Sequence, residues 1–272
     1  MISKKKKFIF FRIPKSAGKS LDFALSHQYI NLPVEYTCSD SGNKDFKKQL
    51  FSKHLSFFHF RISFDDAWFT INGKKTIQKK LDSVDFHNVV KDSAIQDYYK
   101  FCFVRNPWDR VVSNFVGRCN RAHKRKQFKT DNQIRKQFTR FILNEGVEAT
   151  KLSLQEKLEE NKWPNSTKRG KRYSDFGQYA LFSMQQIQYM TDDMTPTGKN
   201  MMDYVGRFEN IKAEIKKISS SKNIEFAMPS TKIGSYKKNH YSYYYNTETK
   251  QIVSELFADD IRIFNYSFED RT

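Results

Sequence analysis

The chain has 272 residues, of which 38% are hydrophobic and 15% aromatic, and its formal net charge is +18 at pH 7. That length is enough for one sizeable hydrophobic core, so we expect a single domain over residues 1–272. The sequence has no run of about 18 apolar residues, and Lys4–Lys7 lead directly into the first apolar segment, so we expect neither a membrane span nor a signal peptide.

The first predicted element is a buried parallel strand that runs into an anion-binding loop. Residues 8–13 are almost continuously apolar, and Pro14 then removes a backbone donor from the ladder. The loop offers two ammonium groups, two hydroxyls and a glycine, and a helix through Leu21 would point its positive end at the same place. We therefore predict a site for a multiply charged anion at the following residues: Lys15, Ser16, Ala17, Gly18, Lys19 and Ser20.

The same segment supplies part of a triphosphate-binding loop, G-x-x-x-x-G-K-[ST]. Gly18-Lys19-Ser20 matches its last three positions, but Ile13 stands where the first glycine belongs. No apolar strand ending in Asp is evident that would hold a magnesium ion. A kinase or NTPase is therefore the weaker interpretation, although it stays open.

A second strand, loop and helix are predicted around residue 105. Phe101–Val104 form a short buried strand, Asn106 is suited to cap a helix, and Pro107 suits its first turn. One helical face is then apolar, through Val111, Val112, Phe115 and Val116. Arg105 stays at the strand end, and Ser113 lies off the apolar face. Two anion sites at two strand ends indicate one ligand with two phosphate-like ends.

The remainder of the chain is predicted to be largely helical and strongly basic. Residues 111–160 have mostly helical patterning, and Thr247 is the predicted N-cap of a final helix. The apolar face of that helix is formed by Ile252, Val253, Leu256, Phe257 and Ile261. Between Arg118 and Arg172 we count sixteen Lys and Arg against six Asp and Glu, which is more than half of the net charge.

The cysteines and histidines give no metal-binding pattern. Cys38, Cys102 and Cys119 are widely spaced and odd in number, which favours a reducing compartment over a disulfide framework. Neither a Cys-x-x-Cys pair, a His-Glu-x-x-His helix nor a calcium loop is present in the sequence. We expect no metal.

Residues 13–21 and 103–113 together resemble the carbohydrate O-sulfotransferases of the chondroitin, dermatan and heparan type. Val205–Asn210 and Phe264–Phe268 are also similar to signatures of that family, which usually has Gly where Asn265 stands. The resemblance implies an α/β fold with a P-loop-like central parallel sheet flanked by helices on both sides. It also implies transfer from 3′-phosphoadenosine 5′-phosphosulfate (PAPS), which leaves as 3′-phosphoadenosine 5′-phosphate (PAP), without a metal.

The family's site residues transfer to this chain by position. The first loop would hold the 5′-phosphosulfate, with Lys15 at the bridging oxygen, while Arg105 and Ser113 would bind the 3′-phosphate. Arg207 is a further cofactor candidate, and Ser235 and Lys237 lie where relatives have a loop over the nucleotide. The general base would be His54, with His59 or a carboxylate as the alternative.

The basic segment is consistent with an anionic glycan acceptor. A solvated basic face, a catalytically silent bisphosphate-binding relative and a polyanion or nucleic-acid binder are other interpretations, although the sequence has no recognisable nucleic-acid motif. Animal members of the family typically have membrane anchors. Because we expect no anchor here, we expect either a cytoplasmic bacterial or viral enzyme or a shortened form of an anchored one. The acceptor and the oligomeric state cannot be derived from the sequence.

Overall fold

The computed structural model describes residues 2–3, 6–18, 20–21, 25, 70–71, 74–75, 96–121, 130–146, 184–224, 226 and 239–271. The chain forms two compact units, one of Met1–Val104 with Met201–Ser235 and the other of Arg105–Asn200 with Tyr236–Thr272. The single domain expected over residues 1–272 stays a prediction.

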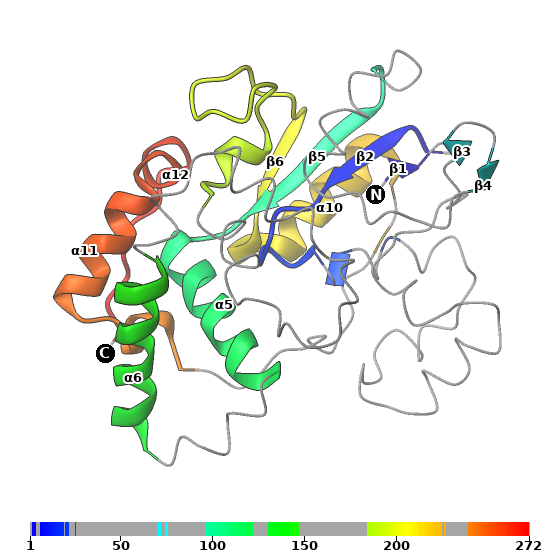
Figure 1. Cartoon of the computed structure of the whole chain (residues 1–272). Coiled ribbons are helices and arrows are strands. Elements are labelled where there is room, and N and C mark those ends of the chain that lie inside the picture. The colour runs from blue at the N-terminus through cyan, green and yellow to red at the C-terminus, as the bar shows by residue number, and fades with distance from the viewer. Residues whose placement is uncertain are drawn as a thin grey trace, which may run out of the picture. The chain divides into compact units, whose positions relative to one another are not determined.

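The first unit is built on a four-stranded sheet (Figure 1). In order across the sheet, its strands are β1 (Ile2–Ser3), β2 (Phe8–Phe11), β5 (Tyr99–Val104) and β6 (Tyr204–Arg207). β2 pairs parallel with β5, and β5 pairs parallel with β6, whereas β1 lies antiparallel to β2. The predicted α/β class with a central parallel sheet is therefore confirmed.

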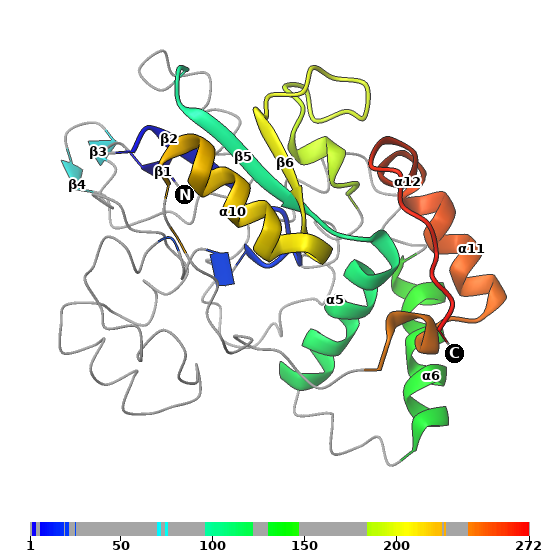
Figure 2. The ribbon, with the colours of Figure 1, turned by 180° about the vertical axis from the view of Figure 1, so that it is seen from behind.

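Both predicted apolar strands lie at the centre of this sheet, because a strand that is buried on both faces has a continuous apolar sequence. Every residue of β2 is at most 3% exposed. α10 (Ile211–Lys222) lies along one face of the sheet (Figure 2). The core on that face consists of Phe8, Phe10, Leu21, Leu25, Phe101, Phe103, Ile215, Ile218 and Ile224.

Two shorter features complete the first unit. The 3-10 turn η6 (Phe208–Asn210) leads into α10, and α10 ends at Asn223, whose φ of 51° is left-handed and whose N–H donates to the Ser219 carbonyl. Asn is one of the few residues that adopt this conformation without a large penalty. β3 (Thr70–Ile71) and β4 (Lys74–Lys75) form a separate antiparallel pair.

The second unit is mainly helical. Its elements are α5 (Pro107–Arg121), α6 (Asp131–Arg140), the π-helix η4 (Phe141–Gly146), the turns η5 (Ile187–Tyr189) and η7 (Tyr241–Tyr244), α11 (Thr247–Leu256) and α12 (Ala258–Ile263). Phe138 is fully buried at the centre of an aromatic cluster. Its ring lies between 4.9 and 6.1 Å, centroid to centroid, from the rings of Phe115, Phe141, Tyr244 and Tyr245.

Most of the described part of residues 111–160 is helical, as predicted. Thr130 caps α6 through a capping box with Gln133, and α6 continues directly into η4. Residues 122–129 and 147–160 lie outside the described part of the chain. Within the described part, no helix combines the length and the apolar character needed to span a bilayer.

The predicted cap of the final helix was wrong by one residue. Asn246, not Thr247, is the N-cap of α11: its Oδ1 accepts from the Thr249 N–H at 2.8 Å, and Thr249 Oγ1 accepts from the Asn246 N–H at 3.0 Å. Asn caps at least as well as Thr, and this reciprocal pair makes Thr247 the first helical residue. The helix is also interrupted at Phe257, where φ is −119°, so the predicted apolar face is divided between α11 and α12.

Candidate functional site

The loop after β2 is a tight turn with an unusual backbone. Lys15 and Ala17 have φ values of 68° and 61°, which are left-handed conformations that cost an L-residue roughly 1–2 kcal/mol. The Ser16 N–H donates to the Ile13 carbonyl at 3.3 Å, and the Leu21 N–H donates to the Ala17 carbonyl at 3.0 Å. Strain of this kind gathers at functional sites, so the turn is a candidate ligand loop on structural grounds as well.

The turn leads straight into a helix that begins at Gly18 and includes Ser20 and Leu21. Ser16 is 1% exposed, which places a hydroxyl inside the turn, while Lys15 and Ser20 are half-buried. Cations, hydroxyls and the first amides of a helix are the groups that hold phosphate and sulfate. The composition of this turn therefore fits a polyanionic ligand.

Gly18 lies directly against the side chain of Arg12, a contact that the sequence did not reveal. A Cβ at Gly18 would lie 2.6 Å from Arg12 Cγ and 2.7 Å from Arg12 Nε, so the arginine side chain crosses this position directly. Arg12 thus brings its guanidinium beside Gly18, where the loop ends and the helix begins. The only sequence signal was a charged residue at the end of an otherwise buried strand.

Arg207 ends β6 at the edge of the sheet where β5 also ends. It pairs with Val104 in the parallel register, and the N–H groups of the following 3-10 turn begin at Phe208. Its side chain is half-buried. This position fits a cofactor contact, but the role of Arg207 stays a prediction.

In the second unit, the side chain of Arg105 donates two hydrogen bonds to Asp109 of α5. Its Nε donates to Asp109 Oδ2 at 2.8 Å and its Nη2 donates to the same oxygen at 2.5 Å. The two side chains are only 8% and 18% exposed. Such a charge-assisted pair in partial burial holds the guanidinium in one orientation.

The start of α5 follows the sequence prediction closely. Asn106 Oδ1 accepts from the N–H groups of Trp108 and Asp109, at 3.1 and 3.3 Å, and Pro107 is the first helical residue. Ser113 lies one helical turn after Asp109 and is half-buried. Ser113, four residues after Asp109 in α5, therefore lies on the same helical face as the carboxylate that holds Arg105.

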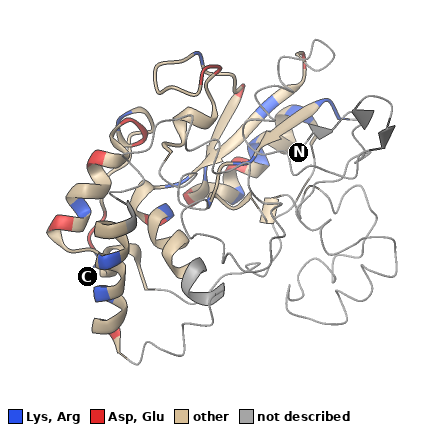
Figure 3. Ribbon diagram, viewed as in Figure 1, with Lys and Arg blue, Asp and Glu red and all other residues tan. Residues whose placement is uncertain are grey.

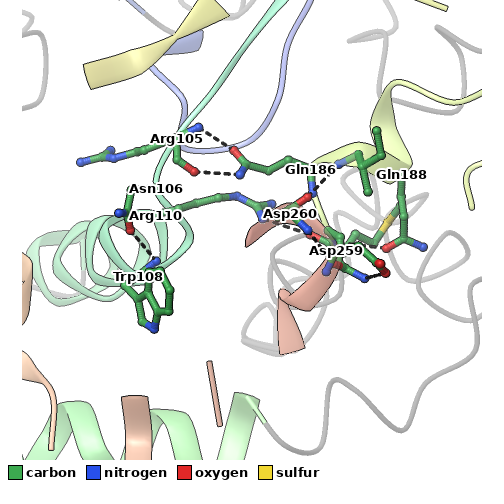
Figure 4. Close-up of polar contacts among 11 residues, drawn as sticks. Arg105, Asn106, Trp108, Arg110, Gln186, Gln188, Asp259 and Asp260 are labelled. Atoms are coloured by element: carbon green, nitrogen blue, oxygen red, sulfur yellow. Dashed lines mark hydrogen bonds and ion pairs between the residues drawn. The ribbon is translucent and has the colours of Figure 1, made fainter. Parts of the chain in front are cut away.

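A glutamine far away in the sequence holds the backbone of Arg105 (Figure 4). Gln186 Oε1 accepts from the Arg105 N–H at 2.9 Å, and Gln186 Nε2 donates to the Arg105 carbonyl at 2.8 Å. The Gln186 N–H in turn donates to Asp260 Oδ2 at 2.7 Å. Sequence reasoning missed both residues, because no motif links positions so far apart.

Behind this contact lies a buried arginine on α5. Arg110 is 2% exposed, its Nη1 donates to the Met184 carbonyl at 3.0 Å, and it lies 4.0 Å from Asp260 Oδ2. Burial lowers the pKa of Arg110 and raises the pKa of Asp260, because each charged form loses solvation. The charge of each group opposes the pKa shift of the other. The backbone N–H groups of Gln186 and Ile187 also favour the Asp260 carboxylate and so oppose the rise of its pKa.

Several predicted site residues lie outside the described part of the chain. They are Lys19, His54, His59, Ser235 and Lys237. Of the histidines, His240 is described, and its Nδ1 accepts from the Ser242 N–H at the start of η7. The identity of the general base therefore stays a prediction. The described residues contain no group of three or more His, Cys, Asp or Glu that could hold a metal ion.

Part of the predicted basic segment is exposed on α6 (Figure 3). Arg135, Lys136 and Arg140 all lie on this helix with solvent-exposed side chains. The guanidinium of Arg135 lies 5.3 Å from the centre of the Tyr243 ring. A cation over an aromatic face at an exposed site contributes about 0.5–1 kcal/mol, so this contact helps to hold the Arg135 side chain in place.

Comparison with known proteins identifies a family for almost the whole chain. Residues 1–267 match the model of the Sulfotransferase family. No curated protein and no solved structure gives a significant match.

Proposed function

Because the chain belongs to the sulfotransferase family, we propose that it moves a sulfuryl group from PAPS to a hydroxyl of an acidic carbohydrate. The bond from sulfur to the bridging oxygen of the donor breaks as the bond from the acceptor oxygen to sulfur forms. The acceptor proton passes to a base, and PAP is released. The family generally uses PAPS as its donor.

The observation that carries the proposal is the turn after β2. It combines the left-handed backbone of Lys15 and Ala17 with the buried hydroxyl of Ser16, and a helix follows immediately. We propose that this turn binds the 5′-phosphosulfate and that Lys15 neutralises the charge that grows on the bridging oxygen. Charge stabilisation of this kind supplies much of the rate in the related phosphoryl transfers.

The second anion-binding element is Arg105 with Ser113, which we propose as the ligands of the 3′-phosphate. A guanidinium can bind phosphate in a bidentate manner, and Asp109 already fixes its plane. The bond between Arg105 and Asp109 thus orients the cation before the ligand arrives. For proton removal we propose His54, with His59 as the alternative.

The acidic nature of the acceptor is proposed from charge. The net charge of +18 and the exposed cations on α6 would raise the local concentration of a polyanionic glycan. The same charge would attract nucleic acid. A sulfate-transfer assay distinguishes the two ligands, because sulfate would be transferred to the acidic glycan but not to the nucleic acid.

Calorimetric titration with PAP, adenosine 5′-monophosphate (AMP) and ATP tests the donor site. We expect PAP to bind tightly without metal, and AMP, which lacks the 3′-phosphate, to bind much more weakly. Arg105→Ala should weaken PAP binding by about 10- to 100-fold, as expected for a lost hydrogen bond to a charged group. Arg135→Ala removes an exposed cation of the same unit and is the matched control, with PAP affinity unchanged.

Lys15→Ala tests the chemical step separately. Turnover with PAPS and an acidic glycan should fall by a much larger factor than the affinity for PAP. Preference for ATP with magnesium over PAP would refute the proposal and favour a kinase. Near-normal turnover in Lys15→Ala would refute the role of that lysine.

A further inference from the structure

One side chain bonds to both backbone polar groups of Arg105. Gln186 accepts from its N–H at 2.9 Å and donates to its carbonyl at 2.8 Å, and Gln186 is fully buried. This pair of bonds resembles the contact that a neighbouring strand would make. The parallel ladder between β5 and β6 ends with Val104, so the glutamine amide holds the next residue along the chain.

The backbone of Gln186 is itself held by a buried carboxylate. Asp260 Oδ2 accepts from the Gln186 N–H at 2.7 Å, and Asp260 Oδ1 accepts from the Ile187 N–H at 2.9 Å. Asp260 is 0% exposed and belongs to α12. A carboxylate with both oxygens bonded has little freedom to move, so the starting point of the Gln186 side chain is fixed.

The negative charge of Asp260 is balanced from α5. Arg110 lies 4.0 Å away, and its guanidinium also lies over the Phe257 ring at 5.5 Å. Three elements therefore meet at this point: the start of α5, the segment before η5, and α12. Each contributes a buried polar group to one connected network (Figure 4).

We propose that Gln186 is a positioning residue for the donor's 3′-phosphate. It fixes the backbone of Arg105 while Asp109 fixes the guanidinium, so that the cation has one place and one orientation. The inference rests on the proposed function, because it assumes that Arg105 binds this phosphate. Supporting residues around a ligand commonly change its affinity by 10- to 100-fold in metal sites, and we expect the lower end of that range here.

The test compares the affinities for PAP and AMP, whose ratio isolates the contribution of the 3′-phosphate. Gln186→Met keeps the approximate length of the side chain but removes both bonds to Arg105. We expect it to lower the affinity for PAP about tenfold, with the affinity for AMP unchanged. If Gln186 served only the general stability of the protein, Gln186→Met would weaken the binding of PAP and of AMP by the same factor.

Gln188→Met is the matched control. Gln188 accepts from the Gln185 N–H at 2.9 Å and donates to the Met194 carbonyl at 3.1 Å, so it makes the same kinds of bond without touching Arg105. The ratio of PAP affinity to AMP affinity in Gln188→Met should equal that of the wild type. If Gln186→Met does not fold, Gln186→Asn, whose shorter amide cannot reach both groups, is measured in the same way.

The possible outcomes separate the two hypotheses. A wild-type protein that binds PAP no better than AMP overturns the proposed function and, with it, this inference. A second outcome is that the wild type prefers PAP over AMP and that Arg105→Ala loses this preference. If Gln186→Met and Gln186→Asn then keep the preference, the inference is overturned and the proposed function stands. A selective loss in the Gln186 variants supports it.

Discussion

Asn265, two residues after the end of α12, allows a sharp test of the backbone geometry. Asn265 has a φ of 50° and is exposed, and the Tyr266 N–H donates to the Ile261 carbonyl at 3.0 Å across it. A left-handed residue with a Cβ costs roughly 1–2 kcal/mol, and Asn avoids part of this cost. Asn265→Ala should therefore lower the free energy of unfolding by about 1 kcal/mol.

Glycine at the same position should be nearly neutral. Relief of the left-handed penalty is offset by about 0.5–1 kcal/mol of additional entropy in the unfolded chain. Asn132→Ala is the matched control, because Asn132 is exposed on α6, where Ala is the better helix former by roughly half a kcal/mol. The same substitution should therefore have opposite signs at residues 265 and 132.

Urea unfolding measures both effects. With a slope of about 1–3 kcal/mol/M, a loss of about 1 kcal/mol lowers the midpoint by roughly 0.3–1 M. The reasoning fails if Asn265→Ala is as stable as the wild type, or if Asn265→Gly loses as much stability as Asn265→Ala.

Three further predictions follow from buried or paired groups. Arg262 donates to Asp259 and lowers the pKa of that carboxyl, so Asp259→Asn should be less stable than the wild type at neutral pH. The difference in melting temperature between the two proteins should vanish as the pH falls below about 4 and through the lowered pKa of Asp259. Phe138→Ala empties the centre of an aromatic cluster and should cost about 3–5 kcal/mol in denaturant unfolding, whereas a cost below about 1 kcal/mol would contradict the packing described. Asp109→Asn leaves the guanidinium of Arg105 without its carboxylate and should cost about 1.5–3 kcal/mol, measured in the same way, with an unchanged midpoint as the contrary result.

Local patterns in the sequence were enough to predict the parts of the fold that local physics decides. The run from Phe8 and the run from Phe101 predicted two buried strands, because only a doubly covered strand tolerates such sequences. That the two strands pair with each other became clear only from the structure. Asn106 followed by Pro107 predicted the start of α5, because capping depends on adjacent residues alone. The family resemblance then supplied roles for residues that physics alone could not assign.

The rest depended on contacts between distant positions or on conformations that residue types disfavour. Gln186 and Arg105 are 81 positions apart, and nothing in either local sequence indicates the other. The left-handed backbone of Lys15 and Ala17 could not be predicted, because neither residue type prefers it. The choice of Asn246 over Thr247 as the cap was decided locally, by the reciprocal bonds between Asn246 and Thr249, and was misassigned by one residue. The interruption at Phe257 is not recorded in the apolar periodicity of the sequence.

The short strand β1 has a consequence for the behaviour of the chain in concentrated solution. β2 is a Phe-Ile-Phe-Phe segment, a composition that promotes edge-to-edge association and fibrous aggregation when its backbone groups are left open. Ile2 and Ser3 pair with Ile9 and Phe8, so two residues at the N-terminus cover that side of the segment. The sequence has four lysines between the two strands, and like charges of this kind would disfavour the approach of a second molecule. The pairing of β1 with β2 therefore leaves less of this apolar strand open to a second molecule.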